Sequence, residues 1–302
     1  MSALPFDDIR AMIADLPPMG APKITPDPGL GRLGELAVWL SCWRAGGGPP
    51  RIHRPILAIY AGSHQVARHS LHAGNSHEVR ERLEIVAAGG AAVNALAQSQ
   101  GAGLEAFDLA VDHPVPDIAE HPALSERDCA ATMAFGMEAL AKQPDLLLLG
   151  DITDGGRIAA AALARLMFGG EAGEWIEEDE SVVRRASERA EVAMGRSTDP
   201  LEALRQLGGR EIAALAGAIF AARTQGVPVV LGGYGPAIAA AVLQRLNPRL
   251  VEHVLVGDAS GYRGVVEEMG LTPLVNYGIT AEEGASALVA LPLLKLACDA
   301  VG

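Results

Sequence analysis

The chain has 302 residues, 49% of them hydrophobic and 20% charged, so it is long and apolar enough to fold around a large core. Its formal net charge of −13 argues against a nucleic-acid or anionic-membrane binder, because both need a cationic surface. Cys42, Cys129 and Cys298 form no CxxC pair, so we expect neither a disulfide framework nor a cysteine zinc site. Early acids and the lack of an apolar signal segment favour a cytoplasmic protein.

Five short apolar runs, bounded by Gly, Asp or Ser, predict buried strands. They lack polar alternation, which is typical of strands that are covered on both faces. The predicted strands are residues 55–60, 106–111, 145–150, 228–231 and 253–257. Helical patterns lie between and after them, over residues 78–98, 125–141, 157–168, 177–194, 210–223, 236–246 and 282–301.

The alternation of strands and helices predicts an α/β fold. We expect a Rossmann-like, mostly parallel sheet with helices on both faces and right-handed crossovers. Both ends of the chain show helical patterns without strands. The sequence therefore predicts a large α/β domain over residues 48–275, and a small helical subdomain formed by residues 1–47 together with 276–302.

Four loops follow predicted strand ends, where open parallel sheets bind ligands. They are residues 61–65, 150–156, 232–235 and 257–262, and all are rich in glycine and small polar residues. The loop 150–156 leads directly into a helix near Arg157, and the backbone N–H groups at a helix N-terminus bind anions such as phosphate. This loop carries neither a Walker A motif nor GxGxxG, and a tight strand-to-helix turn explains it equally well.

Two further patterns are candidate sites. Four histidines between residues 64 and 77 have spacings of five, three and five, which match no zinc pattern, so we predict no metal there. Only His64 lies directly after a predicted strand. Glu282 and Glu283 open the last predicted helix, where acids usually only complement the helix dipole. The functional alternative is a general base, if one carboxylate points into the cleft.

Several segments agree, in chain order, with the motifs of one enzyme family. Residues 25–33 (TPDPGLGRL), 88–94 (AGGAAVN) and 207–218 (LGGREIAALAGA) are similar to its T-K-P-P-G-S-L-G-R-L, G-G-A-A-I-N and L-G-G…E-I-A…G-A segments. Residues 283–287 (EGASA) match its E-G-T-G-A, whose glutamate is the catalytic base. Over nearly its whole length the chain resembles the nicotinate-nucleotide–dimethylbenzimidazole phosphoribosyltransferases, which make the lower-ligand nucleotide of cobalamin.

The loops match the family less well than the scaffold does. The family's G-E-M-G-I-G-N-T-T reads GDITDGGRI over residues 150–158, and the M-R-L-G before the base reads ITAE over 279–282. A fold kept for a changed site gives this pattern. Arg157 is one such change, with two readings: it binds phosphate bidentately, or it pairs with Asp154 or Asp151 and closes the anion site.

The resemblance implies transfer of phosphoribose from nicotinate mononucleotide to 5,6-dimethylbenzimidazole or a related base, giving alpha-ribazole phosphate and nicotinate. It implies Glu283 as the general base, a homodimer, and no cofactor or metal. The phosphate and nucleotide are expected at Asp151, Thr153, Gly155, Gly156, Arg157, Gly233, Tyr234, Gly257 and Ser260, and the base at Ser63, His64 and Ile152.

Two alternatives stay open at this point. One is a phosphoribosyltransferase with another azole or a purine as its acceptor. The other is a catalytically silent relative that binds a nucleotide or base, or partners an active paralogue. The substituted loops favour these alternatives, whereas the retained Glu283 favours an enzyme.

Overall fold

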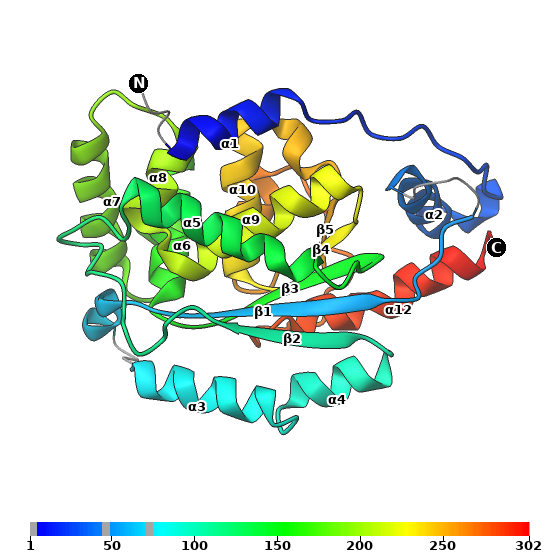
Figure 1. The fold of residues 1–302 in the computed structure, drawn as a ribbon, viewed down its shortest axis with the longest axis horizontal. Helices are drawn as coiled ribbons and strands as arrows, with labels where there is room; N and C mark the ends of the chain where they lie inside the picture. The colour runs from blue at the N-terminus through cyan, green and yellow to red at the C-terminus, as the bar shows by residue number, and fades with distance from the viewer. Residues whose placement is uncertain (1–4, 44–48, 71–74, 302) are drawn as a thin grey trace.

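The computed structural model describes residues 5–43, 49–70 and 75–301. Its sheet has five parallel strands in the order β2-β1-β3-β4-β5 (Figure 1), which confirms the predicted α/β class. The strands are β1 (Pro55–Ser63), β2 (Gly103–Asp108), β3 (Leu146–Asp154), β4 (Val229–Leu231) and β5 (Val254–Val256). β2 begins and ends three residues earlier than predicted, because the Asp108 carboxylate accepts the backbone N–H of Val111 and turns the chain.

Helices cover both faces of the sheet (Figure 1). One face carries α1 (Pro5–Ala14), α5 (Glu126–Gly136), α6 (Gly156–Phe168), α7 (Glu180–Met194), α8 (Pro200–Leu207), α9 (Gly209–Gln225), α10 (Tyr234–Leu246) and α11 (Arg263–Glu268). The other carries α2 (Arg32–Trp43), α3 (Ser76–Ala87), α4 (Ala92–Ser99) and α12 (Ala285–Asp299). Within the described residues, no helix is both long and apolar enough to cross a bilayer.

The sequence predicted most of these helices. Gly89 and Gly90 divide the predicted helix 78–98 into α3 and α4, and Ser125 caps α5 by accepting the N–H of Asp128 at 3.1 Å. The helices α8 and α11 were not predicted, because each is short. The last helix begins at Ala285 after Gly284 as its N-cap, so Glu282 and Glu283 precede it instead of forming its first turn.

A very close helix contact joins α5 and α9. A Cβ atom on Gly136 would overlap the carbonyl of Ala214, and one on Gly217 would overlap the carbonyl of Met133. The Tyr60 hydroxyl, on β1, donates to the carbonyl of Gly136 at 2.6 Å. Small residues therefore let the two helices approach backbone to backbone above the sheet.

The two ends of the chain pack in different places. The helix α1 buries Phe6, Ile9 and Ile13 in the cluster that contains α5, whereas α2 packs on α12. Of the helices at the two ends of the chain, α2 and α12 therefore pack on each other, as a shared subdomain requires, whereas α1 packs elsewhere. The division into two domains stays a prediction, and its expected boundary at residues 47 and 48 lies outside the described residues.

Candidate active site

The strand order reverses between β1 and β3, which places a ligand-binding crevice at their carboxyl ends. β1 is the neighbour of β2 on one side and of β3 on the other, so the connections leave these two strands in opposite directions. Sheets of this order bind ligands at that switch point. Ser63 and His64 end or follow β1, and Thr153 to Arg157 end β3 and begin α6.

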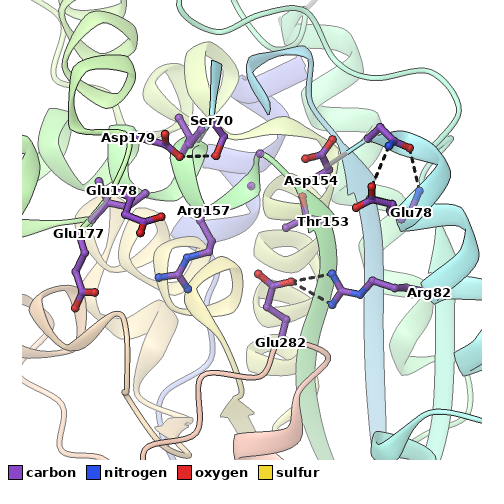
Figure 2. Close-up of a pocket in the computed structure, with 16 residues that line it drawn as sticks. Ser70, Glu78, Arg82, Thr153, Asp154, Arg157, Glu177, Glu178, Asp179 and Glu282 are labelled. Carbon is purple, nitrogen blue, oxygen red and sulfur yellow. Dashed lines mark hydrogen bonds and ion pairs between the residues drawn. The ribbon is translucent and has the colours of Figure 1, made fainter. Parts of the chain in front are cut away.

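A cavity of about 370 Å³ opens at this switch point (Figure 2). It lies between α3, the end of β3, the start of α6 and the segment before α12. Its apolar lining consists of Val79, Ile158 and Ile176. Its charged lining consists of Arg82, Arg157, Glu78, Asp154, Glu177, Glu178, Asp179 and Glu282. The volume suits a small organic molecule.

The N-terminus of α6 forms one wall of the cavity. Gly155 has φ of 78° and Gly156 begins the helix. A Cβ on Gly156 would overlap the side chain of Thr153, so glycine is required there. The first turn can therefore present its N–H groups and the positive end of the helix dipole to an anion. Anion binding at Gly155 and Gly156 stays a prediction.

Arg157 adopts neither of the two predicted arrangements in full. Its Nη2 donates to the carbonyl of Gly261 at 3.3 Å, and its guanidinium carbon lies 5.8 Å from the centre of the Tyr234 ring. Within the described residues it forms no ion pair with Asp151 or Asp154. It lines the cavity, so its charge faces the space at the start of α6.

A second, much smaller space is lined by four more of the predicted nucleotide residues, Asp151, Gly233, Tyr234 and Ser260. It measures about 10 Å³, and Arg157 of α6 and Glu282 of the segment before α12 also line it. A water molecule needs about this much room. The smaller space is therefore too small for a phosphate, whereas the larger cavity beside Gly155 and Gly156 has enough volume for one.

Three glycines, one within β3 and one directly after each of β4 and β5, make room for the segment before α12. A Cβ on Gly150 would overlap the backbone of Glu283 and Gly284, and a Cβ on Gly232 would lie 2.8 Å from the Cα of Gly284. Gly257, predicted at the nucleotide site, faces the backbone of Ser286 in the same way. These glycines allow close backbone packing, which brings the acid pair to the strand ends.

Arg82 of α3 holds both acids of the pair. Its guanidinium Nη2 lies 3.2 Å from Glu282 Oε2 and 3.1 Å from Glu283 Oε1. The two side chains are 22% and 21% exposed. Burial raises the pKa of Glu282, and Arg82 offsets part of that increase. Of the two acids, Glu282 lines both spaces described above.

Asp151 lies at the centre of the strand ends and is almost fully buried. Its Oδ1 has no hydrogen-bond partner among the described residues, and its backbone carbonyl accepts the N–H of Glu283 at 3.0 Å. Burial raises the pKa of Asp151 well above its ordinary value, and the nearby charges of Glu282 and Glu211 raise it further. A buried polar atom without a partner is the kind of group that a bound ligand satisfies.

The three predicted base-binding residues line neither space. Ser63 donates to the carbonyl of Val111 at 2.5 Å, and Ile152 is fully buried in the apolar cluster on the α3 and α12 face. His64 Nε2 lies 2.5 Å from Glu211 Oε1, and both side chains are buried. His64 Nδ1 has no partner within the described residues. The base-binding role of these residues stays a prediction.

The other histidines do not join His64. His69 Nε2 lies 2.6 Å from Asp117 Oδ2, with Glu120 close by. Arg68 forms ion pairs with the same Asp117 and with Glu120, at 2.7 and 3.0 Å, so a positive charge already lies among these groups. His72 lies outside the described residues.

Sequence reasoning missed Arg82 and Asp258. Arg82 belongs to a helix with alternating acidic and basic residues, which resembles a solvated face. The Asp258 carboxylate accepts the backbone N–H and the hydroxyl of Ser260, at 2.8 and 2.5 Å, and the N–H of Tyr277. It thereby fixes the loop after β5. Its position directly after a strand end was the one available signal.

Comparison with known proteins identifies the family of this chain. A family model described as "Phosphoribosyltransferase" matches residues 15–302. The chain is 45% identical to the nicotinate-nucleotide–dimethylbenzimidazole phosphoribosyltransferase of Sinorhizobium medicae (strain WSM419), covering 98% of this chain and 94% of that protein. It is also 45% identical to the protein of the same name from Sinorhizobium fredii (strain NBRC 101917 / NGR234), over 100% and 95% of the two chains.

The fold agrees as well. The crystal structure of CobT from Thermus thermophilus superposes with a TM-score of 0.79 at 26% identity, covering 98% of this chain and 95% of that one. A second structure from that organism, titled as a phosphoribosyltransferase of the same kind, gives a TM-score of 0.78. The chain therefore belongs to the nicotinate-nucleotide–dimethylbenzimidazole phosphoribosyltransferase family, and it is a pentosyltransferase by descent.

Proposed function

We propose that this chain transfers phosphoribose from nicotinate mononucleotide to 5,6-dimethylbenzimidazole or a related base, yielding alpha-ribazole phosphate and nicotinate. The observation that carries the proposal is a cavity that begins at the N-terminus of α6 and is lined by Glu282 and by Arg82, which also holds Glu283. The names of its full-length relatives support the choice of substrates.

The phosphate would bind at the start of α6. Backbone N–H groups near Gly155 and Gly156 donate hydrogen bonds there, and the helix dipole adds positive potential. Arg157 would contribute its guanidinium, which matches phosphate geometry. Six carboxyl groups also line the cavity, so phosphate binding there depends on the helix N-terminus together with Arg157 and Arg82.

The acceptor base would lie against the apolar part of the cavity. Val79, Ile158 and Ile176 provide a surface for a flat aromatic ring. The buried Thr153 hydroxyl, which has no partner among the described residues, is available to a polar atom of either substrate. The acid pair, of which Glu282 lines the cavity, would then lie near the ring N–H.

The chemistry needs one proton acceptor. The unprotonated ring nitrogen of the base attacks the anomeric carbon, and the bond to the pyridinium breaks with its electron pair moving to the nicotinate nitrogen. A carboxylate of the pair accepts the proton from the other ring nitrogen. Asp151, close to the reacting centre, would stabilise positive charge that develops on the ribose when it is ionised.

Nicotinate release tests this proposal. Purified protein is mixed with nicotinate mononucleotide and 5,6-dimethylbenzimidazole, and nicotinate and alpha-ribazole phosphate are separated chromatographically. We expect equal amounts of both products, and far less from the double variant E282Q/E283Q. A rate equal to that of the double variant would contradict the proposed reaction. Titration calorimetry with each substrate would then identify a silent relative that only binds.

We also propose that the chain is a homodimer and acts in the cytoplasm. The resemblance implies the dimer, and sedimentation velocity measures it directly. The cysteines at 42, 129 and 298 are buried, and no disulfide joins them within the described residues, which is typical of proteins in a reducing compartment. Fractionation of the source cells tests the location.

A further inference from the structure

We propose that the buried pair of His64 and Glu211 positions the first turn of α6, where the phosphate of the proposed substrate would bind. The inference rests on the proposed function and names what holds the anion-binding end of the cavity in place. His64 follows β1, and Glu211 lies in the first turn of α9. Neither side chain lines the cavity, so both are positioning residues.

The pair is closed off from solvent. His64 Nε2 lies 2.5 Å from Glu211 Oε1, and the two side chains are 0% and 1% exposed. His64 Nδ1 and Glu211 Oε2 have no hydrogen-bond partner among the described residues. A buried pair with unsatisfied atoms adds little to stability, because taking both groups out of water costs about as much as their contact returns. Its place in the fold therefore points to positioning.

Two glycines leave the space that the pair occupies. A Cβ on Gly62 would lie 2.3 Å from Glu211 Oε2, and a Cβ on Gly209 would lie 2.3 Å from His64 Cε1. Gly209 also has a φ of 72°, a conformation that residues with a side chain rarely adopt. The imidazole and the carboxylate therefore pack directly against backbone and have little freedom to move.

His64 also lies against the start of α6. Its backbone N–H donates to the carbonyl of Asp154 at 3.1 Å, and the next residue, Gly155, is the N-cap of the helix. A Cβ on Gly155 would lie 3.0 Å from the Cβ of His64 and 3.2 Å from the backbone nitrogen of Ala67. The carbonyl of Gly155 accepts the N–H of Ala159 at 3.1 Å, which begins the helix. The turn that starts with His64 therefore supports the N-cap of α6.

The pair also interacts with the carboxyl groups at the end of β3. Burial raises the pKa of Asp151, and the charges of Glu282 and Glu211 raise it further. Burial raises the pKa of Asp154 as well, and the interaction with His64 opposes that increase. Asp154 lines the cavity (Figure 2). The pair is therefore close enough to the cavity wall to influence it without reaching the substrate.

The hydrogen bond supplies a direction that packing alone does not. A bond from an imidazole to a carboxylate is directional and fixes the plane of the ring. Apolar side chains of similar size would fill the same volume, but they would not hold the turn at residues 64–67 against α9. The N–H groups at the start of α6 would then shift, and a misplacement of about 1 Å can slow a reaction about 10²-fold.

A double apolar variant separates positioning from stability. In H64M/E211M neither group is left buried without its partner, and the flexible methionines fill the space, so the urea midpoint should stay the same or rise. We expect amide hydrogen exchange of peptides covering residues 156–163 to become about tenfold faster. We also expect kcat/KM for nicotinate mononucleotide to fall about 10²-fold, and its Kd from calorimetry to rise.

Two further variants serve as controls. E211Q keeps an oxygen for the imidazole N–H, so it should retain most of the parent affinity for nicotinate mononucleotide. R223M/E252M removes a second buried ion pair, in which Arg223 Nη2 lies 3.0 Å from Glu252 Oε2. Arg223 lies in the last turn of α9, at the opposite end from Glu211, so exchange at the start of α6 should not change.

Three results would overturn the inference. The first is parent-like exchange at the start of α6 in H64M/E211M, because the pair would then only fill space. The second is an unchanged affinity for nicotinate mononucleotide in that variant. The third is an unfolded double variant, because the pair would then be needed for folding itself. The exchange measurement needs no turnover. If the unsubstituted chain releases no nicotinate while exchange still depends on the pair, the proposed function fails and the positioning of α6 stands.

Discussion

The α5–α9 contact and the strand ends around Glu283 both depend on glycines that leave no space for a Cβ, but they bury different groups. The first contact buries apolar side chains, and the Tyr60 hydroxyl there is hydrogen-bonded. The second buries polar atoms without partners among the described residues, at Asp151, Thr153 and Ser286. Close packing thus stabilises the scaffold in one region and holds reactive groups for a ligand in the other.

Breaking the scaffold contact should have the largest effect. In G217A the new methyl group meets the carbonyl of Met133 on the facing helix, so α5 and α9 must separate. We expect a loss of about 3 kcal/mol or more in the free energy of unfolding, at the upper end of overpacking effects. Urea denaturation followed by circular dichroism measures it.

G103A is the matched control. Gly103 lies at the start of the edge strand β2, and a methyl group there makes only an ordinary 3.5 Å contact with Ile56. We expect a change within about 1 kcal/mol. Equal effects of the two substitutions would show that the close helix contact does not limit stability.

The scaffold could largely be predicted from the sequence. Apolar runs such as residues 145–150 are covered on both faces and must be strands, and Ser125 is a local signal that starts α5. Parallel strands bring their carboxyl ends together, so the loops near Asp151, Tyr234 and Ser260 were correctly expected to meet.

The charge arrangement of the candidate site could not be predicted in the same way. Arg82 and Glu282 are 200 residues apart and meet only because α3 and the segment before α12 cover the same face of the sheet. The burial of Ser63 and Ile152 follows from strand register, which decides the direction of each side chain. Neither feature has a local signal.

The buried carboxyl group of Asp151 should lower the free energy of unfolding at high pH. Burial is the largest cause of the raised pKa of Asp151, and the charges of Glu282 and Glu211 raise it further. Between the unfolded-state and the folded-state pKa, the folded chain therefore keeps a proton that the unfolded chain releases. Stability therefore falls as pH rises through the folded-state pKa. We expect D151N, which stays neutral, to be more stable than the parent by about 1–2 kcal/mol near pH 8.

The gain should disappear near pH 4, where Asp151 is protonated in the folded state. Urea unfolding at both values measures it, and D15N at an exposed position is the control. A D151N variant that is less stable than the parent near pH 8 would contradict a buried, destabilising carboxylate.

The smallest expected effect concerns Arg82, which joins the two acids. Burial raises the pKa of Glu282 and Arg82 opposes it, so R82Q should raise that pKa further. A carboxylate of the acid pair accepts the proton in the proposed reaction, so the acidic limb of the pH–rate profile should move to higher pH. The rate at alkaline pH should stay the same. The pair is partly exposed, so the change corresponds to about 0.2–1 kcal/mol. R80Q is the control, because Arg80 lies on the same helix but pairs with Asp108 and Asp112. An unchanged limb in R82Q would show that Arg82 does not control the ionisation of the carboxylate that accepts the proton.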